Sequence, residues 1–343
     1  MQDGGLANPP LGFPGSYFAN PAEDYAWDQF WRNAPAPDGV GLQDHLAAAW
    51  AHVAQAFRND PRVFGYELLN EPWPGTLWEP CLLPLLGCPL FDSTLTAFYR
   101  GVVAAVRAAD SGTVIWFEPN VLFNEGIVTH LGTIADPRTG LAFHDYCGPE
   151  SIGLGNTLCG PQDDLTFANA KSYAGKRGIP QLLTEFGATD DLANLSDMVA
   201  RADRNRVGWM EWAYTGNDKT SSSPNGQALV FDPSRPPTGD NVNAAKLKVL
   251  AEPYPQAVAG TPTSWSFSSG TFRLSYSTVR PNGAGSFPAG SETDIAVPPV
   301  HYPNGYSVQV TGGIAACAPN ATTLCILSSP TASMITVTVT QPG

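Results

Sequence analysis

Two glutamates stand at matching places in the sequence. Glu71 follows an apolar run and precedes Pro72, and Glu185 ends another apolar run. Such runs predict buried parallel strands, whose carboxyl ends form the active face of a β/α barrel. Glycoside hydrolysis uses two carboxylates on one rim: one protonates the leaving oxygen and the other attacks the anomeric carbon. The pattern therefore predicts Glu71 and Glu185 as a catalytic pair, about 5–5.5 Å apart in an enzyme that retains configuration.

Other polar and aromatic residues also stand at predicted strand ends. His144 ends the strand between the two glutamates, and Trp212 ends the strand after Glu185, where an indole can serve as a platform for a sugar ring. Glu118 ends a strand as well, and both a packing role and substrate contact stay open for it. No cluster of His, Asp or Glu has metal-ligand spacing and no phosphate-binding loop is present, so the sequence predicts neither a metal nor another cofactor.

Strand and helix patterns alternate through the first two thirds of the chain. The predicted strands cover 63–69, 113–117, 140–143, 179–184 and 207–213, and the predicted helices cover 42–57, 95–106, 165–176, 191–203 and 242–251. The first helix places four apolar residues on one face, which we expect to pack on the core: Leu46, Trp50, Val53 and Phe57. Repeated strand–helix alternation predicts parallel β/α units.

The two ends of the chain have a different character. Residues 1–40 are rich in Gly, Pro and Asn and predict an irregular arm. After Pro255, four runs alternate apolar and polar residues with period two, which predicts a small antiparallel β-sandwich. Asn304-Gly305 lies between two such runs and predicts a hairpin turn. We therefore expect two domains, a β/α domain over 1–258 and a sandwich over 261–343.

The composition excludes some classes of partner. The chain has 343 residues and a formal net charge of −13, from 18 Lys and Arg against 31 Asp and Glu. This balance argues against nucleic-acid binding and against an electrostatic anchor on anionic lipid. The hydrophobic fraction of 43% is enough to bury a large core. No apolar run approaches the ~20 residues of a membrane span, and Met1-Gln2-Asp3 does not begin a signal peptide.

The six cysteines fall into three close pairs along the chain. Six cysteines allow 15 connectivities, and the nearest-neighbour pairing is the expected one. The expected disulfides are Cys81–Cys88, Cys147–Cys159 and Cys317–Cys325. Disulfides in loops are typical of an oxidising compartment, so we expect the full-length protein to be secreted.

The residues around the two glutamates resemble glycoside hydrolase family 5, and within it the endoglycoceramidases and their glucosylceramidase relatives. The resemblance rests on Asn70-Glu71-Pro72, on Glu185, His144, Tyr146 and Trp212, and on the stretch 253–263, which is similar to the junction between barrel and sandwich in those enzymes. It implies a (β/α)8 TIM-type barrel followed by a C-terminal β-sandwich.

The resemblance also implies a role for each residue. Glu71 becomes the acid/base and Glu185 the nucleophile. Asn70 donates to the sugar 2-hydroxyl, and Tyr146 supports the nucleophile. His144 lines the cleft and Trp212 stacks under the sugar. Trp31 resembles a cleft tryptophan of the subfamily, with a packing role left open.

The chain departs from the family at its N-terminal end, where the family's arginine and histidine on early strands have no counterpart. The family barrel has eight strands, whereas the sequence predicts five, with no strand before residue 40. We therefore expect an incomplete barrel that lacks its N-terminal segment, through gene truncation or a misplaced start. The same loss would account for the absence of a signal peptide.

A loop rich in leucine follows Glu71. Residues 78–91 contain six Leu or Phe residues and two cysteines, and predict either a disulfide-closed loop with its own small core or an apolar wall beside the acid/base. Such a wall would suit a lipid aglycone. The predicted function is hydrolysis of the bond between a sugar and a lipid such as ceramide, by a monomer with transient membrane contact. The alternatives are a family 5 β-glucanase or β-glucosidase with a non-lipid substrate, and a non-catalytic sugar-binding remnant.

Overall fold

The computed structural model describes residues 18, 20–83, 85–148, 156–216 and 227–342. These residues form two compact units. The first contains the described residues up to 188 together with 207–213, and the second contains 189–206, 214–216 and 227–342. Each unit is described by itself.

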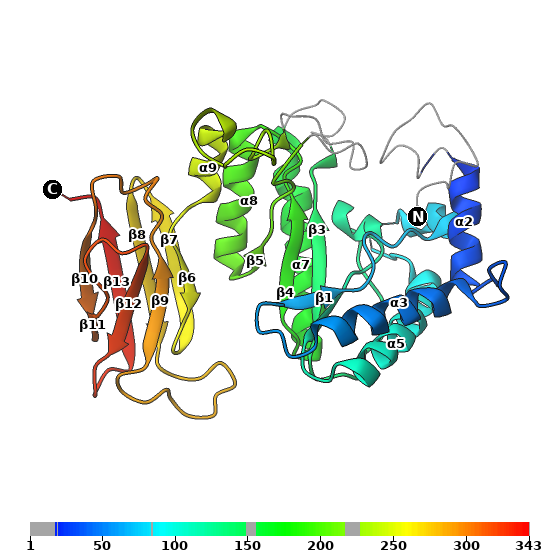
Figure 1. Ribbon diagram of the computed structural model, residues 1–343, viewed down its shortest axis with the longest axis horizontal. Helices are drawn as coiled ribbons and strands as arrows, with labels where there is room; N and C mark the ends of the chain where they lie inside the picture. The colour runs from blue at the N-terminus through cyan, green and yellow to red at the C-terminus, as the bar shows by residue number, and fades with distance from the viewer. Residues whose placement is uncertain (1–17, 19, 84, 149–155, 217–226, 343) are drawn as a thin grey trace. The chain divides into compact units, whose positions relative to one another are not determined.

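A parallel five-stranded sheet is the centre of the first unit (Figure 1). Its strands follow one another in chain order: β1 (Gly65–Glu67), β2 (Val114–Phe117), β3 (Thr139–Asp145), β4 (Gln181–Phe186) and β5 (Gly208–Trp209). All five strands lie within or overlap the predicted runs, and the parallel pairing confirms the predicted β/α architecture.

Helices cover one face of this sheet. Its helices with described bounds are α2 (Pro21–Trp31), α3 (Leu42–Phe57), α4 (Trp78–Cys81), α5 (Pro89–Ala109) and α7 (Cys159–Arg177), with 3-10 turns η1 (Gly75–Leu77), η2 (Val121–Glu125) and η3 (Asn156–Leu158). Phe117 of β2 contacts Tyr99 of α5 and Tyr173 of α7, and Phe143 of β3 contacts Phe167 of α7. The helix-facing side is therefore apolar and buried.

The opposite face of the sheet is concave. Thr184 of β4 donates a hydrogen bond of 2.8 Å to Glu67 of β1, although two strands lie between them. A flat sheet with strands about 4.8 Å apart would keep these side chains more than 10 Å apart, so the sheet is strongly curled. Trp116 of β2 lies between Gly65 and Gly140 on the neighbouring strands, and a Cβ at either glycine would meet its indole at 2.5 or 2.3 Å.

The expected irregular arm over residues 1–40 is wrong where the structure describes it. Residues 21–31 form helix α2, capped by the Asn20 side chain, which accepts from the Ala22 N–H, and started by Pro21. Trp27 and Phe30 of this helix are buried. The Gly- and Pro-rich surroundings concealed a normal capping signal, Asn followed by Pro at the first helical position.

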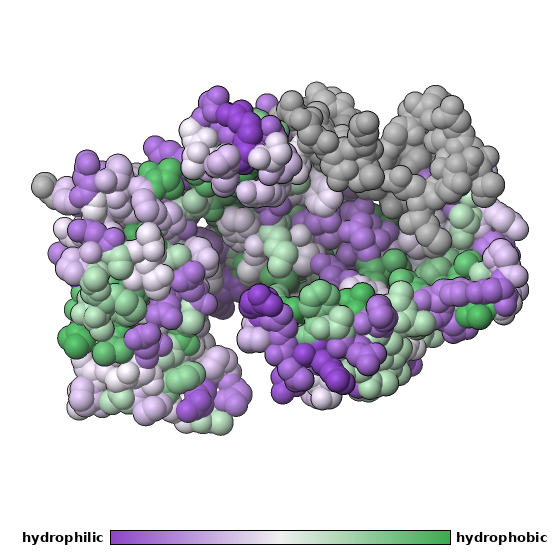
Figure 2. Space-filling model, viewed as in Figure 1, coloured by the Kyte–Doolittle hydropathy of each residue, from purple (hydrophilic) through white to green (hydrophobic). Residues whose placement is uncertain are grey.

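Helix α3 forms where expected but packs through a different stripe. Val53 and Phe57, which we expected to pack on the core, are exposed, whereas Ala54 is fully buried. Trp50 donates from its indole to the Leu68 carbonyl. The helix packs against α5, and the small side chain of Ala54 permits a close approach between the two. The surface over α3 and α5 consequently mixes hydrophobic and hydrophilic residues (Figure 2).

In its described residues the second unit contains a β-sandwich and the helical elements α8 (Leu192–Asn205), η5 (Gly239–Asn241) and α9 (Ala244–Leu250). One sheet has the order β10-β13-β8-β7 and the other β11-β12-β9-β6. The strands are β6 (Tyr254–Ala257), β7 (Thr261–Ser268), β8 (Thr271–Ser277), β9 (Glu292–Ala296), β10 (Ser307–Thr311), β11 (Gly313–Ala315), β12 (Thr323–Ser328) and β13 (Met334–Thr340). All pairings are antiparallel, as predicted.

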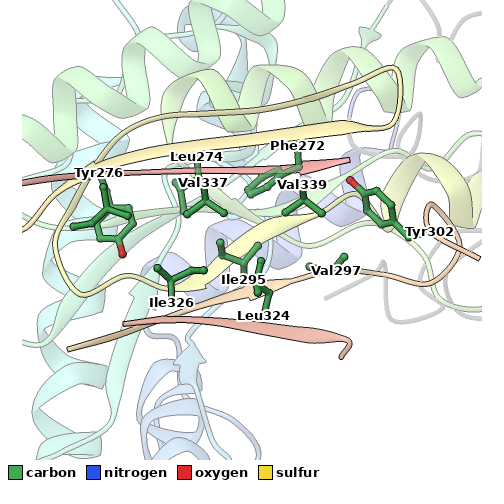
Figure 3. Packing of buried hydrophobic residues seen from close by; sticks show 11 residues of the cluster. Phe272, Leu274, Tyr276, Ile295, Val297, Tyr302, Leu324, Ile326, Val337 and Val339 are labelled. Carbon is green, nitrogen blue, oxygen red and sulfur yellow. The ribbon is translucent and has the colours of Figure 1, made fainter. Parts of the chain in front are cut away.

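The sandwich core lies between the inner faces of its two sheets (Figure 3). It contains Phe272, Leu274, Tyr276, Ile295, Val297, Tyr302, Leu324, Ile326, Ile335, Val337 and Val339. Alternate residues of β8, β12 and β13 contribute to it, which is the period-two pattern seen in the sequence.

Two details of the predicted sandwich differ from the structure. Strand β6 pairs with β9, so the sandwich begins before residue 261; Pro255 within the strand hid it. Asn304-Gly305 does form a turn, with Gly305 at φ +86°, but it leads from β9 of one sheet to β10 of the other and makes no hairpin. The tight hairpin lies instead at Ser269-Gly270 between β7 and β8, where both residues have positive φ.

All three expected disulfides are present: Cys81–Cys88, Cys147–Cys159 and Cys317–Cys325. This confirms the nearest-neighbour pairing. Within the described ranges, no helix combines the length and the apolar character that crossing a bilayer requires.

Candidate active site

The carboxyl edge of the parallel sheet brings Glu71, His144 and Glu185 together. Glu71 follows β1, His144 lies near the end of β3, and Glu185 lies near the end of β4. One polar side-chain atom from each of the three lies within 4.8 Å of the others. A carboxylate oxygen of Glu71 therefore lies within 4.8 Å of one of Glu185, in the short range that retaining glycosidases use.

His144 occupies the centre of this site. A bulge between Phe143 and His144 shifts the register of β3 so that His144 pairs with Glu185. Its Nδ1 lies 2.9 Å from Glu71 Oε1 and 3.5 Å from Glu185 Oε2. Burial by itself lowers the pKa of His144. The negative charge of Glu118 and the hydrogen bond and charge of Glu71 outweigh that effect and raise the pKa to about 10.

Glu71 is held from several directions. It is 3% exposed, and its backbone has φ +45°, a left-handed conformation that costs a non-glycine residue about 1–2 kcal/mol. The backbone N–H donates to Glu118 Oε2 at 3.1 Å, and Asn124 Nδ2 donates to Glu71 Oε1 at 3.2 Å. Both the backbone and the carboxylate of Glu71 are therefore fixed before any substrate arrives.

Glu185 is more accessible than Glu71. Its side chain is 19% exposed, and the Tyr146 hydroxyl donates to its Oε2 at 2.8 Å. Burial raises the pKa of Glu185, the charge of His144 opposes this, and the charge of Glu71 adds to it. Burial and the neighbouring charge of Glu185 raise the pKa of Tyr146 well above its usual value, so this phenol stays protonated and donates.

Glu118, which the sequence pattern left undecided, belongs to the same buried cluster. It is 2% exposed at the end of β2, with its Oε2 3.6 Å from His144 Nε2. Burial raises the pKa of Glu118, and the charge of His144 opposes this. We place the proton of this pair on His144, because Glu118 Oε2 already accepts the Glu71 N–H. Only its place at a strand end could have identified it from sequence.

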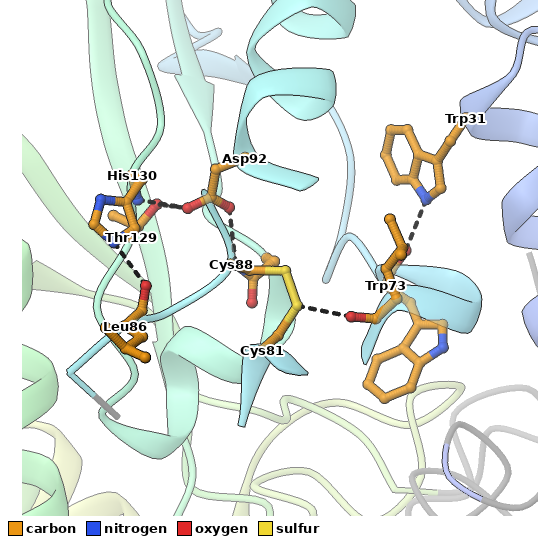
Figure 4. The surroundings of a disulfide bond; sticks show 10 residues. Trp31, Trp73, Cys81, Leu86, Cys88, Asp92, Thr129 and His130 are labelled. Carbon is orange, nitrogen blue, oxygen red and sulfur yellow. Dashed lines mark hydrogen bonds between the residues drawn. A yellow bond between two sulfur atoms is a disulfide. The ribbon is translucent and has the colours of Figure 1, made fainter. Parts of the chain in front are cut away.

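The remaining predicted site residues are Asn70, Trp212 and Trp31. Asn70 is exposed. The Trp212 N–H donates to the Phe186 carbonyl, which fixes Trp212 beside the end of β4. Trp31 lies in an aromatic cluster: it stacks on Trp27 at 5.6 Å, and its indole donates to the Trp73 carbonyl at 2.7 Å (Figure 4).

Two groups in this site have the composition of a cation site. They are Glu71, His144 and Glu185, and Glu67, Glu118 and His144, each with its polar atoms within 4.8 Å. Sequence spacing did not reveal them, because their members come from separate strands. Both need His144 as a neutral nitrogen ligand, whereas both of its ring nitrogens face carboxylates, the arrangement that favours the protonated ring. The residues present therefore fit a charged imidazole better than a metal ion.

The leucines in the described part of the leucine-rich loop form no small core of their own. Leu82, Leu83, Leu85 and Leu86 are between 43% and 86% exposed. The Cys81–Cys88 disulfide and a contact of 2.9 Å between the His130 ring and the Leu86 carbonyl tie the loop down (Figure 4). The loop thus presents its leucines outward.

Comparison with known proteins agrees with this geometry. Residues 22–218, more than half of the chain, match the family described as Cellulase (glycosyl hydrolase family 5). The chain belongs to glycosyl hydrolase family 5. Residues 253–340 match the Glycoside hydrolase family 5 C-terminal domain, which corresponds to the sandwich.

Within family 5 the chain is similar to endoglycoceramidases. It is 33% identical to Endoglycoceramidase I of Rhodococcus hoagii (strain 103S) over 98% of this chain and 64% of that protein, and 26% identical to an Endoglycoceramidase of Hydra vulgaris over 86% and 52%. The chain thus spans less than two thirds of the length of these relatives. The solved structure of Endo-glycoceramidase II from Rhodococcus sp. in a ganglioside GM3 complex matches with a TM-score of 0.78 and 27% identity, over 99% of this chain and 72% of that one.

Proposed function

We propose that this chain carries the catalytic pair of a retaining β-glycosidase that separates a sugar or oligosaccharide from a lipid aglycone such as ceramide. One observation carries the proposal: carboxylate oxygens of Glu71 and Glu185 lie within 4.8 Å on one edge of a parallel sheet. An inverting enzyme needs about 6.5–9.5 Å between its carboxyl groups to admit a water molecule.

The geometry supports a double displacement. The Glu185 carboxylate attacks the anomeric carbon while Glu71 delivers its proton to the leaving glycosidic oxygen, which breaks the bond to the aglycone. Glu71 then removes a proton from water, whose oxygen attacks the anomeric carbon and releases Glu185. The Tyr146 hydroxyl holds Glu185 Oε2 during both steps. No oxidant, reductant or cofactor enters the balance.

A lipid aglycone is supported by the apolar loop that follows the acid/base. Leu85 is 86% exposed and Leu90 is 78% exposed. An apolar surface of this kind, next in sequence to the group that protonates the leaving oxygen, suits a leaving group with alkyl chains and transient contact with a micelle or membrane. The similarity to endoglycoceramidases points in the same direction.

Several finer assignments belong to the same proposal. Asn70 donates to the sugar 2-hydroxyl, Trp212 stacks under the ring, and Trp31 acts through packing or at the cleft. The protein is secreted, as its three disulfides suggest, and acts as a monomer. The proposed division into a β/α domain over 1–258 and a sandwich over 261–343 falls a few residues after the start of the second family match at residue 253.

The alternative substrate is a β-glucan or simple β-glucoside, since residues 22–218 match the family described as Cellulase. The two substrates are separated by incubating the chain with lactosylceramide micelles and, in parallel, with cello-oligosaccharides. We expect release of lactose and ceramide and little cleavage of the cello-oligosaccharides. The reverse preference would establish the alternative.

Leucine variants sharpen this test. Leu85→Ser with Leu90→Ser should lower the rate on micellar glycolipid about tenfold and leave a soluble aryl β-glycoside unaffected. Ile314→Ser, which alters a residue of the sandwich that is 63% exposed, is the matched control. Equal losses on both substrates would remove the argument for a lipid aglycone.

A further inference from the structure

Glu118 lies behind the catalytic pair, where it cannot reach a substrate. It is 2% exposed, and the Tyr99 hydroxyl donates to its backbone carbonyl at 2.8 Å, which ties the end of β2 to helix α5. Among the described residues, its Oε1 has no hydrogen-bond partner. A buried carboxylate with an unused oxygen is unfavourable unless an opposite charge compensates it. That charge lies beside it in His144.

The two oxygens of Glu118 are not equivalent. Oε2 accepts the Glu71 backbone N–H at 3.1 Å and lies 3.6 Å from His144 Nε2. One atom therefore contacts the backbone of the acid/base and faces the ring that bridges the acid/base and the nucleophile. This bond helps to hold the left-handed backbone of Glu71 at φ +45°, a conformation that is unfavourable for a residue with a Cβ.

The imidazole of His144 lies between carboxylates on both sides. Nδ1 lies 2.9 Å from Glu71 Oε1, and Nε2 faces Glu118. A neutral ring would direct a lone pair at one of these oxygens, whereas a ring with hydrogens on both nitrogens satisfies both. Three other titratable groups face this pair, namely Glu67, Glu185 and Tyr99. Of these, Glu67 accepts a hydrogen bond from the Thr184 hydroxyl.

We propose that Glu118 is a positioning residue for the reaction assigned above: it fixes the backbone of Glu71 and keeps His144 charged between Glu71 and Glu185. The role of Glu118 in catalysis rests on the proposed function, whereas its effect on the Glu71 backbone and on the charge of His144 does not. A charged His144 stabilises the anionic form of both carboxylates in turn as the proton leaves and returns to Glu71. Glu118 contributes the compensating negative charge without contacting the sugar.

The test follows the protonation of His144 directly. The chain has five histidines, so ring-labelled protein gives few NMR signals, and the His144→Gln variant identifies the one from His144. In the parent chain this ring should stay protonated above pH 8. In Glu118→Gln, which keeps the shape and removes the charge, we expect the titration midpoint to fall by at least about one pH unit.

A matched variant separates this effect from a loss of stability. Asp136→Asn removes another largely buried carboxylate, which pairs with Arg107 at 2.7 Å just before β3 begins, at the opposite edge of the sheet. It should lower the melting temperature and leave the His144 titration unchanged. If Glu118→Gln fails to fold, Glu118→Asp takes its place, because the retracted carboxylate should give a smaller shift in the same direction.

Two outcomes would overturn the inference: an identical His144 titration in the parent and the Glu118 variants, or an equal shift in Asp136→Asn. Activity adds a second readout. Glu118→Gln should lower kcat on lactosylceramide at least about tenfold relative to Asp136→Asn, with KM little changed. Absence of glycosidase activity in the parent would refute the proposed function alone, since the NMR titration still decides the role of Glu118.

Discussion

The sandwich and the parallel sheet bury very different side chains. The sandwich core consists of aliphatic and aromatic residues from both sheets, such as Phe272, Ile326 and Val337. The parallel sheet is equally apolar on its helix-facing side, but its carboxyl edge buries Glu71, Glu118 and His144 at 1–3% exposure. The sandwich buries apolar side chains, whose burial stabilises the fold. The sheet edge buries charged side chains, which destabilise the fold unless they compensate one another.

This difference shows where to look for function in a chain of this kind. Burying apolar area contributes about 25 cal/mol per Å², whereas a buried charge destabilises unless it is paired and hydrogen-bonded. The cluster at the sheet edge satisfies that condition through His144. We therefore expect variants of the sheet edge to change activity most and variants of the sandwich core to change stability most.

Removing the nucleophile should have the largest effect. Glu185→Gly should lower the rate of glycolipid hydrolysis by about 10⁴-fold, because no other carboxylate can attack the anomeric carbon. Sodium azide should then restore turnover and yield a glycosyl azide of inverted configuration, which NMR of the product detects.

Glu71→Ala serves as the partner of that variant. It should lower the rate of hydrolysis of natural glycolipids by about 10²–10⁴-fold. The rate on aryl glycosides should be little changed, because their good leaving groups need no protonation. If azide rescued neither variant, the assignment of Glu71 and Glu185 would fail.

A variant of the sandwich core should lose stability and keep its activity. Phe272→Ala should lower the free energy of unfolding of the second unit by about 3–5 kcal/mol, since Phe272 is fully buried in the core. Urea unfolding followed by tryptophan fluorescence measures this loss. Activity per folded molecule should stay at the parent level. A loss below about 1 kcal/mol would mean that the core has room to collapse around the deletion.

Two disulfides offer the finest comparison, because they close loops of nearly equal length in the two regions. Their sequence separations are 7 for Cys81–Cys88 and 8 for Cys317–Cys325. Replacing either pair with serine should destabilise its own unit by about 2–3 kcal/mol. Only the first replacement should also slow hydrolysis of micellar glycolipid, since it frees the leucine loop. An equal loss of activity from both replacements would contradict a specific role of the leucine-rich loop in hydrolysis.

Much of the fold could be predicted because its signals are local. Apolar runs located all five parallel strands, and cysteine proximity gave all three disulfides. Helix α2 was missed because glycine and proline around it outweighed the cap at Asn20. The burial of α3 was wrong at Val53 and Phe57, because a helix with apolar residues on several sides does not reveal which stripe meets a neighbour.

The site was harder to predict, since its contacts join strands that are far apart in sequence. The strand ends identified Glu71, His144 and Glu185, but the bulge that aligns His144 with Glu185 has no sequence signature. The partnership of Glu118 with the Glu71 backbone spans 47 residues and depends on the curl of the sheet. Trp31, for which the sequence left both packing and a place in the cleft open, lies among Trp27, Phe30 and Phe91, and no local pattern predicts these contacts.

The indole of Trp116 has a consequence for how this sequence can change. It occupies the space that a side chain at Gly65 or Gly140 would need, although these glycines are 75 positions apart. Either glycine can acquire a methyl group only if residue 116 becomes smaller, and a smaller residue there leaves a void that both neighbours could fill. The three positions therefore form one unit of substitution. We expect related sequences with a smaller residue at position 116 to carry residues larger than glycine at positions 65 and 140. This reciprocal variation would be visible in the amino-acid sequences alone.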